Sequence, residues 1–190
     1  LTILPAQLDR WKPEEALGRA MDEIAAALEA HPAARGVAIM DAVGTATSVA
    51  DRLRLRLPSL KVGEVHGLTS ATGRRQALAA RFTVGTSTIE VGVDFVGPHA
   101  KDLLLFDART AAQFLQRLGR IGRHSKAEPI PNLVFALVPA YVFHFLREKA
   151  SGEAEMTREA LRDLVMDAYR PYESFDAYVR RHSPVEMHHA

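Results

Sequence analysis

The chain has 190 residues, of which 47% are hydrophobic and 25% charged, and its formal net charge is +1. These values exclude a disordered or fibrous chain and allow one domain with a sizeable core. They also exclude a uniformly basic coat for nucleic acid, so any site for a polyanion must be local. The sequence contains no cysteine, which excludes disulfides and thiolate metal sites and suits a reducing compartment. Since no apolar run is long enough for a membrane helix, we expect a cytoplasmic protein without membrane contacts.

The chain begins at Leu1 rather than at a methionine, and we expect it to be a piece of a longer protein. A first helix is predicted over 13–29, where apolar side chains recur at helical spacing opposite charged ones. Short apolar runs then alternate with helical patterns. The predicted strands lie at 35–41, 61–66, the start of 83–95, 102–107 and 132–139, and the predicted helices between them at 45–57, 69–82 and 110–123.

After Pro139 the pattern becomes purely helical. Helices are predicted over 140–151, 157–169 and 171–183, and we expect their aromatic side chains, such as Tyr169, to build a small core against the sheet. The alternative for these aromatic side chains is stacking on bases.

Apolar strands that alternate with helices are typical of a parallel sheet covered by helices on both faces. We therefore expect an α/β domain over 35–139, preceded over 1–34 by a lead-in with one amphipathic helix and followed over 140–190 by a helical extension. Ligands of such folds gather at the carboxyl ends of the strands. In this chain those ends lead into Asp41, His66, Thr86 and Asp107.

The segment QFLQRLGRIGRH (113–124) has three arginines at intervals of three residues, with two glycines among them. On a helix, Gln113, Arg117 and Arg120 share one stripe. Each glycine would weaken a helix by about 1 kcal/mol, so both suggest close approach by a ligand or another backbone. Arginine forks suit phosphate oxygens, and several at one point suit a polyphosphate whose charge redistributes during a reaction. The alternative is a solvated basic helix face.

The segment TVGTSTIEVGVDF (83–95) continues from a strand into hydroxyl side chains and then Gly92 and Asp94. Hydroxyls and amides just beyond a strand can hydrogen-bond a nucleic-acid backbone, and an aspartate can accept a hydrogen bond from a ribose. Taken alone, the segment is as consistent with a structural turn.

Together, GTSTIEVGVDF and QFLQRLGRIGRH resemble motifs V and VI in the second RecA-like domain of superfamily 2 helicases. VAIMDAVGTATSVADRL resembles motif IV and its following helix, so the resemblance spans 35–139. It implies a RecA-like fold that binds ATP together with a first RecA-like domain. Within the superfamily, the two segments look most like the CRISPR-associated type I interference helicases, and the following VFALVPAYV suggests the subtype I-D form.

The resemblance implies that Arg120 and Arg123 are arginine fingers that reach the γ-phosphate of ATP. Gln116 and Arg117 match the first two positions of motif VI, whose roles are coupling and contacts near the nucleotide. Gly92 and Asp94 match motif V positions on the ribose side of ATP. The residues implied in nucleic-acid contacts follow the strands and are Thr86, Ser87 and, as looser matches, His66 and Gly67. Because ARFTVGTST lacks the usual spacer before motif V, Phe82 is predicted to belong to the strand itself.

The chain lacks the other parts of a helicase motor. It has no G-x-x-x-x-G-K-[ST] loop, and the acidic pair Asp22 and Glu23 falls within the amphipathic helix, where a solvated face is expected. We therefore expect ATP and Mg²⁺ to be held mainly by the first RecA-like domain and this chain alone to be inactive. The histidines near the C-terminus, His182, His188 and His189, lack the spacing of a metal site.

The implied function is an ATP-dependent DNA helicase or translocase in CRISPR interference. Its implied partners are single-stranded DNA, a crRNA-guided surveillance complex and a fused or separate nuclease, which this chain does not contain because it has no His-Asp dipeptide. Two alternatives remain open: the corresponding half of an RNA helicase, and a non-catalytic RecA-like docking module.

Overall fold

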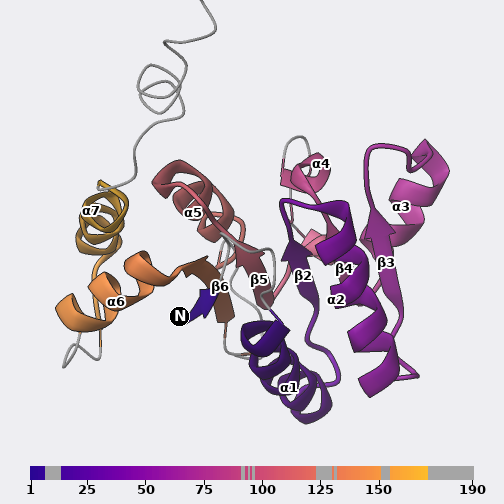
Figure 1. Cartoon of the computed structure of the whole chain (residues 1–190). Coiled ribbons are helices and arrows are strands. Elements are labelled where there is room, and N and C mark those ends of the chain that lie inside the picture. The colour runs from indigo at the N-terminus through magenta and orange to yellow at the C-terminus, as the bar shows by residue number, and fades with distance from the viewer. Residues whose placement is uncertain are drawn as a thin grey trace, which may run out of the picture.

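The computed structural model describes residues 1–6, 14–90, 93, 95, 97–122, 130, 132–150 and 155–170. Six strands in this part of the chain form one parallel sheet in the order β1-β6-β5-β2-β4-β3 (Figure 1). The strands are β1 (Thr2–Ala6), β2 (Gly36–Ile39), β3 (Val62–Val65), β4 (Phe82–Gly85), β5 (Leu103–Asp107) and β6 (Leu133–Pro139). The α-helices are α1 (Glu14–Ala30), α2 (Val43–Arg56), α3 (Ala71–Ala79), α4 (Ser87–Glu90), α5 (Ala111–Leu118), α6 (Ala140–Lys149) and α7 (Arg158–Tyr169).

The central strands are buried on both faces because helices cover both sides of the sheet. In β5, Leu103 and Leu105 belong to the core under α1 and α2, whereas Leu104 and Phe106 belong to the core under α5, α6 and α7. This alternation is the period of two that a strand imposes on its side chains. The expected fold class, a parallel sheet covered by helices on both faces, is therefore confirmed.

The sheet has one strand more than the sequence predicts. Strand β1 pairs in parallel with β6, with Thr2 opposite Phe135 and Pro5 opposite Val138. We expected a lead-in without a strand at this point. The sequence pattern does not reveal this strand, because it is short and contains proline, which is tolerated at the edge of a sheet but argues against a central strand. The sheet thus includes residues from the range 1–34.

Several local expectations are confirmed. Helix α1 closely matches the predicted range, and Phe82 is the first residue of β4. Helices α6 and α7 match two of the three predicted C-terminal helices. The third, at 171–183, lies outside the described residues, as do the three C-terminal histidines.

Lys101 is a buried cation at the amino end of the sheet, just before β5. Only 4% of the residue is exposed, and its Nζ donates to Thr83 Oγ1 at 3.0 Å and to the Ala80 carbonyl at 3.4 Å. Burial and the nearby charge of Arg35 lower the pKa of Lys101 to about 7, against the opposing effect of Asp102. A neutral lysine therefore suits this site better than a charged one.

The depressed pKa makes the free energy of unfolding depend on pH. Between about pH 7 and 10 the unfolded chain binds a proton at Lys101 that the folded chain does not, so stability rises with pH in this window. We expect Lys101→Met to stabilise the chain by about 1–3 kcal/mol at pH 6, since it removes a charge buried without a carboxylate partner. The gain should shrink toward pH 10.

Urea denaturation at pH 6, 8 and 10 measures this effect. The matched control is Lys61→Met at an exposed lysine, which should leave the pH profile unchanged. A Lys101→Met variant that is less stable than the wild type at pH 6 would contradict the assignment.

Candidate nucleotide and nucleic-acid site

The predicted gathering of strand ends is present. All six strands run in parallel, so their carboxyl ends meet at one edge of the sheet. Asp41 follows β2, Asp107 ends β5, and Thr86 follows β4. His66 follows β3 at the far side of the same edge.

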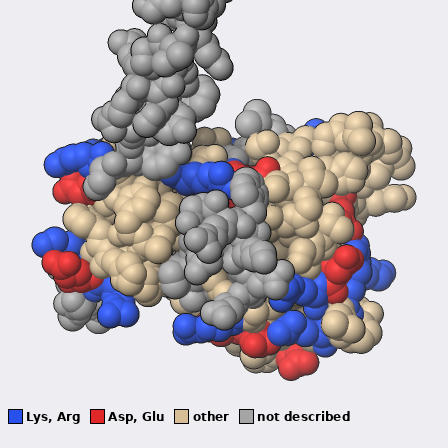
Figure 2. Space-filling view, viewed as in Figure 1, with Lys and Arg blue, Asp and Glu red and all other residues tan. Residues whose placement is uncertain are grey.

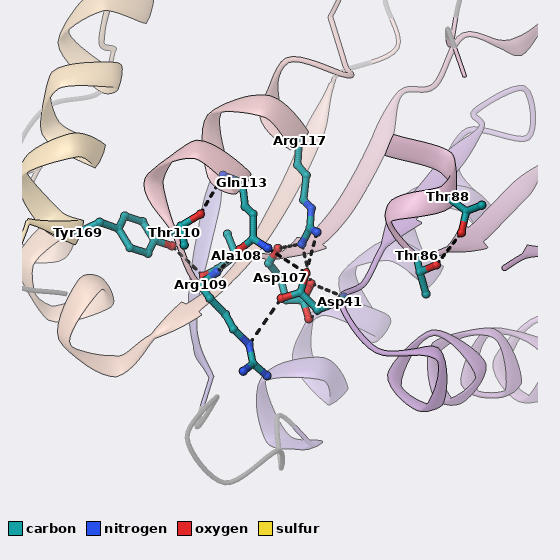
Figure 3. A network of polar contacts seen from close by, with 10 residues as sticks. All are labelled: Asp41, Thr86, Thr88, Asp107, Ala108, Arg109, Thr110, Gln113, Arg117 and Tyr169. Carbon is teal, nitrogen blue, oxygen red and sulfur yellow. Dashed lines mark hydrogen bonds and ion pairs between the residues drawn. The ribbon is translucent and has the colours of Figure 1, made fainter. Parts of the chain in front are cut away.

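A buried arginine joins two of these strand ends. Arg117 of α5 is 1% exposed, and its Nη2 lies 2.7 Å from Asp41 Oδ1 while its Nη1 lies 2.9 Å from Asp107 Oδ1 (Figure 3). Nη1 also donates to the backbone carbonyl of Asp107. The Asp41 amide donates to Asp107 Oδ1 at 3.0 Å. We call Asp41, Asp107 and Arg117 the clamp, because they tie β2, β5 and α5 together.

Polar groups around the clamp orient its members. Gln113 Nε2 donates to Asp41 Oδ1 at 3.3 Å, and Gln113 Oε1 accepts from the Arg109 amide at 2.9 Å. Arg109 Nε lies 3.5 Å from Asp41 Oδ2. Tyr169 of α7 donates its hydroxyl to the Ala108 carbonyl at 2.8 Å (Figure 3). The loop between β5 and α5 is therefore fixed from both sides, and Tyr169 is part of the core as expected.

The clamp holds two carboxylates close together with one buried arginine. Burial and the neighbouring charge of Asp41 raise the pKa of Asp107 to about 7, against the opposing effects of Arg117 and backbone hydrogen bonds. The clamp can therefore take up a proton near neutral pH. Burial also raises the pKa of Tyr169, which keeps its hydroxyl protonated as a donor.

The arginine-rich segment is only partly helical. Helix α5 ends at Leu118, and Gly119 caps it. The expectation of one helical stripe that includes Arg120 is therefore wrong, since Arg120 lies in the turn that follows. Gly122 has φ +74°, which side chains other than glycine rarely adopt. Glycine therefore suits position 122 in this turn, whereas Gly119, at φ −66°, has an ordinary helical conformation.

The turn brings the arginine-rich segment against the segment 83–95. The Arg120 amide donates to the Arg117 carbonyl at 2.9 Å, and Arg120 Nη1 donates to the Val93 carbonyl at 3.1 Å. Gln116 is exposed on α5. Arg123 lies outside the described residues. Of the four residues predicted to contact the nucleotide through motif VI, the structure thus places one in the clamp, one in the turn and one on the surface.

The hydroxyl-rich residues Thr86, Ser87 and Thr88 follow β4 at the same edge of the sheet as the clamp. Thr86 is buried, and its Oγ1 lies 2.9 Å from Thr88 Oγ1 (Figure 3). Arg74 of α3 donates to the Thr88 carbonyl at 3.1 Å, which fixes the end of α4. Ser87 is exposed. Gly92 and Asp94, predicted near the ribose, lie outside the described residues.

The loop after β3 completes this edge. The His66 amide donates to Thr69 Oγ1 at 2.9 Å, and Gly67 is exposed. In the space-filling view, Lys and Arg side chains are interspersed with acidic ones over the lower part, where α1 lies, and the part over α3 and α4 shows few charged atoms from this side (Figure 2). The acidic pair of α1 lies elsewhere: Asp22 is exposed and pairs with Arg56 at 2.6 Å, as the solvated-face interpretation predicts.

The described residues bring no three histidine, aspartate or glutamate side chains together to hold a metal ion. None of the helices in the described part of the chain is long and apolar enough to cross a membrane. The residues that the sequence did not assign are Asp41 and Asp107 as partners of Arg117, together with Arg109 and Tyr169. No local pattern connects them, because Asp41 and Arg117 are 76 positions apart.

No protein-family model and no curated protein sequence matches the chain. Solved structures do match. The chain is similar to domain 2 of the DEAD-box helicase Mss116p bound to an RNA duplex, with a TM-score of 0.58 and 15% identity over 89% of this chain and 68% of that one. It is also similar to a CRISPR-associated protein, with a TM-score of 0.57 and 19% identity over 94% of this chain and 23% of that one.

A third similar structure is the DUF1998 helicase MrfA bound to DNA, with a TM-score of 0.59 and 11% identity over 77% of this chain and 21% of that one. The chain therefore spans less than a quarter of two of these three proteins. At such identities the likeness establishes the fold. The chain has the RecA-like fold seen in the second domain of helicases.

The clamp makes a direct prediction for stability. We expect Arg117→Met to lower the free energy of unfolding by about 3–5 kcal/mol at pH 8, because it leaves two buried carboxylates without their cation. The loss should be smaller at pH 5, where Asp107, with its raised pKa, can stay neutral in the folded state. Chemical denaturation at both pH values measures it, with Arg162→Met at an exposed arginine of α7 as the control. Equal losses at pH 5 and pH 8 would show that the carboxylates do not repel each other.

Proposed function

We propose that the chain is the second RecA-like half of an ATP-dependent superfamily 2 helicase or translocase. The observation that carries this proposal is the contact between Arg120 and Val93, which joins the two segments that resemble motifs VI and V at the carboxyl edge of a RecA-like sheet.

Arg120 and Arg123 would act on the γ-phosphate of ATP when the two RecA-like domains close. Arg120 is half-buried in a turn that begins next to Arg117 of the clamp, and its guanidinium donates to the Val93 carbonyl. The guanidinium is therefore restrained in the absence of a ligand. A restrained cation aimed at a developing negative charge stabilises the transition state of phosphoryl transfer. Gly92 and Asp94 would meet the ribose side, and Gln116 would contact the partner domain near the nucleotide.

The residues of this chain fit the phosphates of ATP better than they fit Mg²⁺. The Asp41 and Asp107 carboxylates already bind Arg117, so they are not arranged as metal ligands. We therefore assign the phosphate cradle and Mg²⁺ mainly to a first RecA-like domain. The role of Arg117 follows from its burial: it supports the site through the clamp and does not itself reach the nucleotide.

Thr86, Ser87, His66 and Gly67 would grip one nucleic-acid strand through its phosphates. Hydroxyls and backbone amides beyond the strand ends suit contacts to phosphates that do not depend on sequence. The buried Thr86 would act through Thr88, which shares its hydroxyl hydrogen bond.

We favour single-stranded DNA in CRISPR interference as the substrate context, with a crRNA-guided surveillance complex and a fused or separate nuclease as partners. The motif resemblance and the likeness to a CRISPR-associated protein over 94% of this chain support this choice. The likeness to an RNA-bound DEAD-box domain supports the alternative of an RNA helicase. Unwinding of matched DNA and RNA duplexes distinguishes the two.

In protein that contains both RecA-like halves, we expect Arg120→Ala to lower the ATPase kcat by about 100-fold or more. Nucleic-acid affinity should change less than about twofold, since the turn is separate from the strand grip. The matched control is Arg170→Ala at an exposed arginine just after α7, which should keep wild-type turnover. Normal turnover in the Arg120→Ala variant would overturn the arginine-finger assignment and favour the docking module.

The strand grip has its own test. Ser87→Glu places a negative charge where a phosphate is proposed to bind, and we expect it to weaken single-stranded DNA binding by about tenfold at low salt. ATP hydrolysis without DNA should be unaffected. Ser59→Glu introduces the same change in the loop between α2 and β3, at the other edge of the sheet, and should bind DNA normally. Equal weakening by both variants would indicate a general charge effect.

A further inference from the structure

The clamp contains a residue to which the motif resemblance gives no role. Asp41 follows β2 and is 66 positions from Asp107, yet its backbone amide and its carboxylate both bind within the clamp. The pairing of β2 with β5, with Ile39 opposite Phe106, brings the two aspartates together at the ends of neighbouring strands. Asp41 is therefore the link between the sheet's β2 end and helix α5.

The link continues to Arg120 through the backbone. Arg117 is held by the two carboxylates on its side chain, and its carbonyl accepts the Arg120 amide at 2.9 Å. The capping amide of Gly119 donates to Leu115 at 3.0 Å. The side-chain anchor of Arg117 and the start of the arginine turn are therefore joined through hydrogen bonds of the backbone.

The charged and titratable groups that face Asp41 come from two elements and their connecting loop. They are Asp107 at the end of β5, Arg109 in the loop and Arg117 in α5, with Tyr169 of α7 behind the loop at Ala108. Gln113 adds a neutral donor. Asp41 is the more accessible carboxylate of the clamp, with 16% of its side chain exposed against 4% for Asp107.

We propose that Asp41 is a positioning residue for phosphoryl transfer: through Arg117 it sets the place of the turn that carries Arg120. The proposal rests on the proposed function, in which Arg120 contacts the γ-phosphate. It assigns Asp41 no contact with ATP. Loss of its charge leaves the arginine present but displaced, which lowers the rate of the chemical step and leaves ATP binding by the other domain unchanged.

The first experiment measures steady-state ATPase in protein with both RecA-like halves. Asp41→Asn should lower kcat by about 10- to 100-fold, the size expected for a small displacement of a catalytic group, with the KM for ATP changed less than about twofold. Asp51→Asn removes the same charge from an exposed position on α2 and should have wild-type kinetics. An unchanged kcat in a folded Asp41→Asn variant would overturn the proposal.

A double-mutant cycle with Arg120→Ala separates positioning from a general loss of structure. If Asp41 acts through Arg120, the double variant should be about as slow as Arg120→Ala alone. Effects that multiply would show that Asp41 acts elsewhere and would contradict the proposal. Asp41→Glu keeps the charge pair, and thus the fold, but adds one methylene. It should still lower kcat by about fivefold or more, whereas a purely stabilising role predicts wild-type activity.

A measurement on the chain alone keeps this proposal distinct from the proposed function. The Nε–Hε signals of Arg117 and Arg120 in NMR spectra report whether each guanidinium is held. Asp41→Asn should shift and broaden both signals, and Asp51→Asn should alter neither. If Arg120→Ala retains full ATPase activity while these signals respond to Asp41→Asn, Arg120 is not an arginine finger, but Asp41 still positions the arginine turn through Arg117. If the signals do not respond, the link itself is wrong.

Discussion

The structure depends on one buried arginine between two carboxylates. Arg117 is almost fully buried, and a cation in that position is tolerable only because Asp41 and Asp107 both bind it. These aspartates stand at the ends of neighbouring parallel strands, so the ion pairs fix helix α5 at one position on the edge of the sheet. The turn after α5, the loop before it and the contact with Val93 all take their places from this anchor.

The fold and the site are connected by the direction of the strands. A parallel sheet gathers its carboxyl ends at one edge, and Asp41, Thr86 and Asp107 lie there. The opposite edge holds Lys101, whose charge is buried without a carboxylate in contact and whose pKa is lowered. The two ends of the sheet thus differ in how a buried cation is compensated. At the carboxyl end two carboxylates bind Arg117, whereas at the amino end the lowered pKa of Lys101 favours its neutral form.

The fold class could be predicted because strand and helix periods are local. The apolar run of β5 and the amphipathic spacing of α1 identify these elements without any tertiary information. Strand β1 could not be recognised in this way, because a short edge strand with Pro5 owes its stability to pairing with β6. The end of α5 also differs from the prediction, since the pattern of arginines continues beyond Leu118, where the helix ends.

Only those parts of the candidate site that are formed by consecutive residues could be predicted from the sequence. The arginine and hydroxyl segments were recognised from their sequence, and the structure brings them together through Arg120 and Val93. The partnership of Asp41 with Arg117 was not, because it is set by the order of strands in the sheet. The described arginines of this segment differ in their surroundings: Arg117 is buried in the clamp, and Arg120 lies half-buried in the turn that follows.

The central claim is that the clamp presents Arg120 to the γ-phosphate of ATP held by a first RecA-like domain. The most direct test is a structure of protein with both halves, determined with nucleic acid and a non-hydrolysable ATP analogue. The account predicts the Arg120 guanidinium within about 3 Å of a γ-phosphate oxygen, with Arg117 still bound to Asp41 and Asp107. A closed complex in which Arg120 remains bound to the Val93 carbonyl and makes no contact with the nucleotide would contradict it.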